Sequence, residues 1–110
     1  MNLKHLTDET LLNDTDNLVK DVREILTAVL HHMREIERRR LFSALKYSSL
    51  YEYATKRLGY SEDQAYRRIS AMRLLKEIPE LEEKINSGSL TLTHMGMAQS
   101  FFRRKAKTTK

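Results

Sequence analysis

Glycine and proline are scarce in this chain, and their scarcity limits the possible folds more than any other feature. Only three glycines and one proline occur among 110 residues, whereas an all-β fold needs such residues at many of its tight turns. A few glycines and one proline are enough to end or open helices. This length allows one domain with a modest core. We therefore predict an all-α fold, a small helical bundle formed as a single domain by residues 1–110.

The longest predicted element is a scaffold helix over residues 14–40. Its apolar residues follow one another at alternating steps of four and three until His32 interrupts the series: Leu18, Val22, Ile25, Val29 and Ile36. A second stripe beside them consists of Leu26, Leu30 and Met33. So wide an apolar face is typical of a helix that is buried on two sides or pairs with another chain, so a homodimer through this helix is a possible assembly. Thr7 is expected to cap a separate short turn ahead of it.

Two helices joined by a short turn are predicted over residues 49–78. Each opens with a capping box, a serine followed three residues later by Glu or Gln: Ser49 with Glu52, and Ser61 with Gln64. Gly59 suits the end of the first helix, and Pro79 prevents the second from continuing past Ile78. The connection Gly59-Tyr60-Ser61 is typical of a helix-turn-helix, the alternative being an ordinary helical hairpin.

Residues 79–105 are predicted to hold the C-terminal helices and a basic tail. Pro79 suits the first turn of a short helix that Gly88 terminates, and Thr91 or Thr93 is expected to cap a last helix. The formal charge of the chain is +5, but residues 1–30 carry a net −3 and residues 31–110 a net +8. This asymmetry favours a polyanionic partner, double-stranded DNA before an anionic membrane, although an ordinary soluble surface also fits it.

The second helix of the pair presents side chains suited to nucleic acid. On a helical wheel, Ala65, Ile69 and Met72 face inward, and the residues predicted to bind DNA face outward: Tyr66, Arg67, Ser70 and Arg73. Arginine can reach guanine edges or phosphates, and Tyr and Ser can add backbone contacts. The tail adds three candidate phosphate-binding residues, Arg103, Arg104 and Lys105. Glu62 and Asp63 would repel phosphate. Arg68 falls nearer the boundary of the core, where a structural ion pair is as compatible with its position as a contact to DNA.

An ordered series of motifs runs through residues 50–93. The segment LGYSEDQAYRRISAMR is followed by Pro79-Glu80-Leu81 and then by Gly88, Leu90 and Leu92. This series resembles the helical region that precedes the nuclease domain in bacterial HNH endonuclease-type proteins. A weaker similarity, to the helix-turn-helix of ParB-type partition proteins, rests on Gly88, Leu90, Thr91 and His94. Ala54 departs from that second pattern, because it lies one residue farther from Gly59 than the small residue that the pattern places there.

The resemblance implies a non-catalytic DNA-binding module, either the N-terminal part of an HNH endonuclease-type protein or a stand-alone relative. The nuclease finger of that family needs metal-binding histidines, and the four histidines here form no such motif. We therefore expect no enzymatic activity, no metal and no cofactor. His31 and Glu35 share a helix face, but two ligands do not make a metal site.

Other features narrow the compartment and leave a second function open. The absence of cysteine excludes disulfides, thiol nucleophiles and cysteine-based zinc sites. No apolar run approaches the length of a membrane span, and the acidic N-terminus lacks a signal pattern, so a cytoplasmic protein is expected. The alternative function is a protein-interaction or oligomerisation module. It would use the long helix and a C-terminal apolar cluster, Met95, Met97, Phe101 and Phe102.

Overall fold

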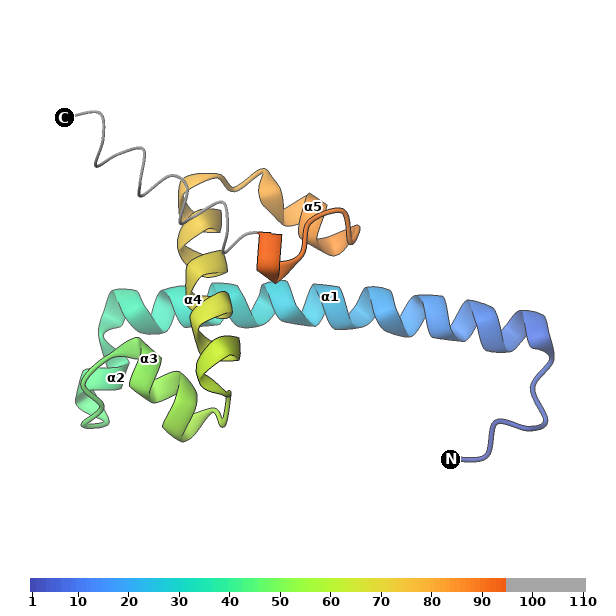
Figure 1. The fold of residues 1–110 in the computed structure, drawn as a ribbon, viewed down its shortest axis with the longest axis horizontal. Helices are drawn as coiled ribbons and strands as arrows, with labels where there is room; N and C mark the ends of the chain where they lie inside the picture. Colours follow the sequence, from blue (N-terminus) through green and yellow to red (C-terminus); the bar gives the residue numbers. More distant parts are fainter. Residues whose placement is uncertain (95–110) are drawn as a thin grey trace.

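The computed structural model describes residues 1–94, and every regular element within them is a helix. In chain order these are α1 (Asp8–Arg39), α2 (Leu41–Ala44), α3 (Leu50–Glu52), the π-helix η1 (Tyr53–Arg57), α4 (Glu62–Glu77) and α5 (Leu81–Asn86). A last helical turn covers residues 92–94. The predicted all-α fold with a long N-terminal helix is therefore confirmed (Figure 1).

Helix α1 is one continuous element of 32 residues. Thr7 caps it, because the Thr7 hydroxyl accepts a hydrogen bond from the backbone N–H of Thr10 at 3.2 Å. The prediction of a separate turn before a helix starting at residue 14 is wrong. No glycine or proline interrupts residues 8–39. The acidic residues near the predicted start at residue 14 therefore lie within one continuous helix and do not begin a new one. The helix ends at Arg40, which adopts a left-handed backbone conformation with φ of 55°.

Helices α2, α4 and α5 pack against the C-terminal half of α1, while α3 and η1 pack against α4 (Figure 1). Helix α4 crosses this half, and α5 and α2 also contact α1. Four large side chains at the centre are almost completely buried: Leu30 and Met33 of α1, and Met72 and Leu74 of α4. Three fully buried alanines, at positions 54, 65 and 71, allow the helices to approach closely. Each large apolar side chain buried here contributes about 1.5–3 kcal/mol to folding.

The first helix of the predicted pair begins at Leu50 but changes into the π-helix η1 at Tyr53. The Leu58 N–H donates to the carbonyl of Tyr53 at 3.2 Å, five residues earlier, and the Tyr60 N–H donates to that of Ala54 at 3.1 Å. A π-turn holds more residues than an α-turn. Ala54 lies in this turn and is fully buried.

The predicted caps and stops agree largely with the structure. Ser61 and Gln64 form a complete capping box, with hydrogen bonds of 3.0 and 3.2 Å. At Ser49 only half of the box forms, because the carboxylate of Glu52 accepts the Ser48 hydroxyl instead of the backbone N–H of Ser49. Gly59 and Gly88 both have the positive φ expected of stop residues, 79° and 83°. Helix α5 begins at Leu81, two residues after Pro79, and Thr91 caps the final turn by accepting the His94 N–H at 3.2 Å.

The N-terminal half of α1 extends beyond the packed part of the structure (Figure 1). We call this packed part, which consists of the C-terminal half of α1 with α2, α3, η1, α4 and α5, the body. The 32 residues of α1 span about 48 Å, and the longest dimension of residues 1–94 is 59 Å. The radius of gyration, 17.2 Å, exceeds the value of about 13 Å expected for a compact domain of 100 residues. None of the helices formed by residues 1–94 combines the length and apolar character required to cross a membrane.

Candidate functional site

The outward face predicted for α4 is only partly present. Arg67 is exposed and the Tyr66 side chain is 49% exposed. Ser70 is only 3% exposed, so the prediction that it points outward to DNA is wrong. Helix α4 packs against α1 on one side and against α3 and η1 on another, so its buried surface is wider than the single apolar face of a helical wheel. Arg103, Arg104, Lys105 and the predicted apolar cluster of residues 95–102 lie outside the described residues.

Arg73 is directed toward α1. Its Nη2 atom donates to Oε2 of Glu37 at 3.1 Å, and about two fifths of the side chain remains exposed. Arg68 forms no ion pair with a residue among positions 1–94. Its guanidinium instead stacks over the ring of Tyr60, 4.4 Å from the centroid, and donates to the carbonyl of Gln64 at 3.3 Å. Of the predicted arginines that lie within residues 1–94, Arg67 is therefore the most available to a ligand.

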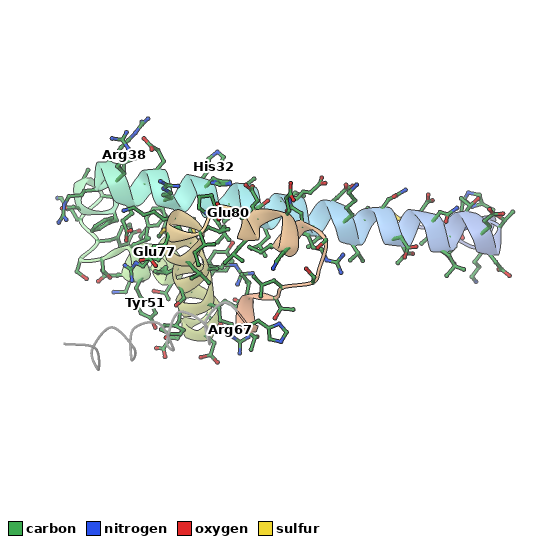
Figure 2. All side chains as sticks on the ribbon, turned by 90° about the horizontal axis from the view of Figure 1, so that it is seen from above. His32, Arg38, Tyr51, Arg67, Glu77 and Glu80 are labelled. Atoms are coloured by element: carbon green, nitrogen blue, oxygen red, sulfur yellow. The ribbon has the colours of Figure 1, made fainter. Side chains whose placement is uncertain are left out.

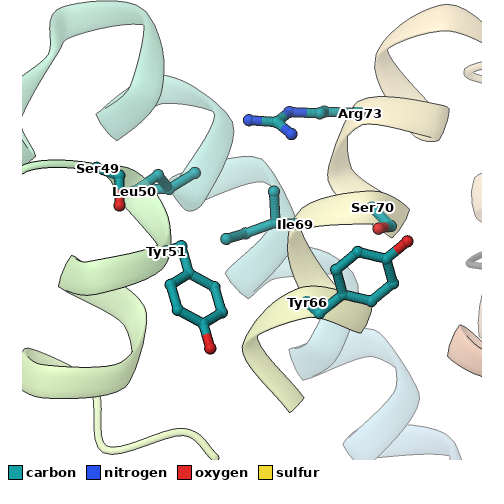
Figure 3. Close-up of a pocket in the computed structure, with 7 residues that line it drawn as sticks. All are labelled: Ser49, Leu50, Tyr51, Tyr66, Ile69, Ser70 and Arg73. Carbon is teal, nitrogen blue, oxygen red and sulfur yellow. The ribbon is translucent and has the colours of Figure 1, made fainter. Parts of the chain in front are cut away.

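A groove between α3 and α4 contains several of the predicted residues (Figure 3). Tyr51 comes from α3, and Tyr66, Ser70 and Arg73 come from α4. Its volume of about 190 Å³ is below the 300–1,000 Å³ of common small-molecule sites. Partial burial raises the pKa of the Tyr51 phenol, and the negative charges of Glu62 and Asp63 raise it further. These carboxylates also oppose a phosphate group, so the groove suits a ring or an apolar side chain better.

A second cavity, of about 260 Å³, lies between the C-terminal ends of α1 and α4. Arg34, Arg38 and Lys76 line it together with Glu37. Neither Arg34 nor Lys76 forms an ion pair with another residue of the described chain. Sequence reasoning missed this basic cavity, because its lining residues come from α1 and α4, which are far apart in the sequence. This cavity is separate from Arg67, the exposed arginine predicted to bind DNA: Figure 2 shows Arg38 and Arg67 on opposite sides of the body.

Glu35 organises two of the arginines at the end of α1. Its carboxylate accepts hydrogen bonds from Arg38 and from Arg39, the latter at 2.6 Å. These two guanidinium groups lower the pKa of Glu35 from 4.5 to about 2. Glu35 is therefore not available to share a metal with His31, whose Nε2 atom lies 2.8 Å from Oε1 of Glu82. Among residues 1–94, no three His, Asp or Glu side chains are grouped as a metal site requires.

The projecting part of α1, residues 8–25, exposes a row of apolar side chains. Leu18 is 64% exposed, Val22 is 65% exposed and Ile25 is 62% exposed. Leu11, Leu12 and Val19 are exposed as well. Farther along the same helix, Leu30 and Met33 are buried in the core. The wide apolar face predicted from the sequence is thus covered by the body only in its C-terminal half.

Comparison with known proteins adds no relative. A scan against protein-family models found no match, and neither did searches of curated proteins and of solved structures. The functional assignment consequently rests on the residues and their geometry.

Proposed function

We propose that this chain is a non-catalytic helical module that self-associates through the projecting part of α1. The observation that carries the proposal is the row of apolar side chains centred on Leu18, Val22 and Ile25, each more than three fifths exposed. Single exposed apolar residues are common on protein surfaces, but a contiguous apolar patch marks an interaction site. Here the patch continues along a helix for several turns, as it does in helices that pair with one another.

The energy available at this surface is large enough to support association. Burial of a Leu, Val or Ile side chain contributes about 1.5–3 kcal/mol. Three such residues on each of two chains therefore provide a free energy comparable with the cost of about 4–15 kcal/mol for bringing two molecules together. The outlying Leu11 and Val19 extend the same surface. A reversible complex of moderate affinity is the expected result.

Sedimentation equilibrium over a range of protein concentrations tests this function. The unmodified chain should change from monomer to a larger species as concentration rises, and Val22→Glu should shift that transition to higher concentration. Asn13→Glu is the matched control, because it adds the same charge on the opposite side of the helix, nine residues away. A monomer at every concentration, or equal effects of the two substitutions, would contradict the proposal.

A second candidate function is the binding of double-stranded DNA by the body. Two observations support it: the exposed Arg67 on α4 and the basic cavity, in which Arg34 and Lys76 have no acidic partner within residues 1–94. Phosphate neutralisation by such side chains supplies most sequence-independent affinity for DNA. In this proposal the chain is the N-terminal part, or a stand-alone relative, of an HNH endonuclease-type protein, as the motifs of residues 50–93 suggest.

A salt titration of DNA binding separates the two basic regions. If the cavity binds phosphates, Arg34→Ala with Lys76→Ala should lower affinity and reduce the salt slope by about one for each phosphate that is no longer neutralised. Arg67→Ala tests α4 in the same way. Lys20→Ala, on the projecting part of α1, is the control and should leave the slope unchanged. Equal slopes for all variants, or no binding to duplex DNA or RNA at low salt, would contradict this candidate.

A further inference from the structure

We propose that the partner on the projecting part of α1 is a second copy of this chain, parallel and in register, so that two α1 helices form a short two-stranded coiled coil. This inference rests on the self-association function proposed above and specifies the orientation and register of the two helices. It draws on three properties of α1: which residues occupy the exposed seam, which charges flank the seam, and where the body begins.

The exposed seam has a heptad spacing. Steps of four and three residues connect six positions along the helix: Leu11, Thr15, Leu18, Val22, Ile25 and Val29. In heptad notation, Thr15, Val22 and Val29 occupy the a positions, and Leu11, Leu18 and Ile25 occupy the d positions. β-Branched residues at a combined with leucine at d favour parallel dimers over higher oligomers. All three a residues are β-branched, and two of the three d residues are leucine.

The charges beside the seam discriminate between the two possible orientations. Asp14 and Asp21 occupy the flanking g positions, whereas the e positions hold Leu12, Val19 and Leu26. In a parallel pair each g residue faces an e residue of the other chain, so Asp14 faces Val19 and Asp21 faces Leu26 of the second copy. No like charges meet there. In the antiparallel pair that keeps the same seam, Asp21 faces its own counterpart, which is destabilising.

The body fixes the end of the coiled coil. Leu26, Val29 and Ile36 are all half-buried and pack against the core of their own chain. His32, the next d position, is polar. The paired region is therefore confined to about residues 11–25, ahead of the body. A parallel arrangement places both bodies at the same end of the coil.

Disulfide trapping tests the orientation directly, because the chain contains no cysteine. In the parallel register, Thr15→Cys alone and Ile25→Cys alone should each form a covalent dimer on mild oxidation, since identical a or d positions face each other. In the antiparallel register, residue 15 faces residue 25, and the mixture of both variants should form the mixed dimer instead. Mass spectrometry distinguishes the mixed dimer from the two symmetric ones. Asn13→Cys, on the opposite side of the helix, is the control for random collision.

Each outcome is decisive. Symmetric dimers at positions 15 and 25, formed well above the Asn13→Cys control, support the parallel coiled coil. A predominant mixed dimer would overturn the orientation while the sedimentation data still supported self-association. Cross-linking no greater than the control, together with a monomer in sedimentation, would overturn both the orientation and the proposed function. All three substitutions are at exposed positions, and circular dichroism verifies that the helical content is unchanged.

Discussion

The two halves of α1 have similar apolar spacing but different surroundings. In the C-terminal half, Leu30 and Met33 are buried by α4 and α5, whereas in the N-terminal half Leu18 and Val22 are largely exposed. The difference arises because the chain beyond Arg40 turns back over only the nearer half of the helix (Figure 1). Apolar periodicity thus identifies which face of a helix is to be covered, while the path of the rest of the chain decides whether its own body covers it.

The strongest test of this comparison is the same substitution in each half. Leu30→Ala should lower the free energy of unfolding by about 2–5 kcal/mol, because it leaves a cavity in the core. Leu18→Ala should change it by no more than about 0.5 kcal/mol, because this side chain is exposed in the monomer and alanine favours a helix. Urea unfolding at concentrations where sedimentation shows a monomer gives both values. Similar losses for the two variants would mean that residue 18 is packed in the monomer.

The junction between the halves offers a second, smaller test. Arg23 lies at the end of the projecting part, and its guanidinium rests on Gly88, where an added Cβ would come within 2.5 Å of Arg23 Cζ. Gly88→Ala should cost about 1–2 kcal/mol for the left-handed backbone, and little more, because the end of the arginine side chain can move aside. Gly59→Ala is the matched control, with φ of 79° and nothing within 4 Å of the new Cβ.

Thermal unfolding of the two alanine variants measures the effect of Arg23 on this junction. Nearly equal losses of stability would show that the Arg23 side chain moves aside, and that the body packs only loosely at the junction. A much larger loss for Gly88→Ala, abolished in an Arg23→Ala background, would show instead that the boundary of the body is rigid and extends to Arg23. Unchanged stability in both variants would contradict the argument from the left-handed backbone.

Sequence reasoning succeeded where structure depends on neighbouring residues. The capping box of Ser61 and Gln64 and the stops at Gly59 and Gly88 were predictable because the groups involved are at most a few residues apart. The burial of Ser70 was not predictable, since it depends on two helices packing around α4. The π-helix η1 also escaped prediction, because the sequence of residues 53–57 suits an α-helix equally well.

The candidate site was predictable to a smaller extent. Arg67 is exposed as expected, but the pairing of Arg73 with Glu37 joins residues 36 positions apart, and no local pattern indicates it. The basic cavity likewise combines Arg34 from α1 with Lys76 from α4. Side chains from distant segments meet only once the crossing of the two helices is known, which is why the wheel of one helix could not reveal them.

The ion pair between Arg73 and Glu37 provides a third test, with a smaller expected effect. It connects α4 to the packed half of α1, but both side chains are about one third or more exposed, so solvent weakens it. A double-mutant cycle with Arg73→Ala and Glu37→Ala should give a coupling energy below about 1 kcal/mol. Chemical unfolding at low and high salt measures it. A coupling of several kcal/mol would mean that the pair, and not the apolar core, fixes α4 on α1.

The smallest effect concerns the charges at the end of the packed half. Arg38 and Arg39 lower the pKa of Glu35 from 4.5 to about 2. Because the folded-state pKa is depressed, the stabilisation is fully present above pH 4.5 and is lost as pH falls through about 2. Carbon NMR of the Glu35 carboxyl should show the low midpoint, and Arg38→Gln with Arg39→Gln should raise it toward 4.5. Arg34→Gln, which removes a charge without a bond to Glu35, should leave the midpoint nearly unchanged. A midpoint near 4.5 in the unmodified chain would show that the two arginines are free to bind an external anion.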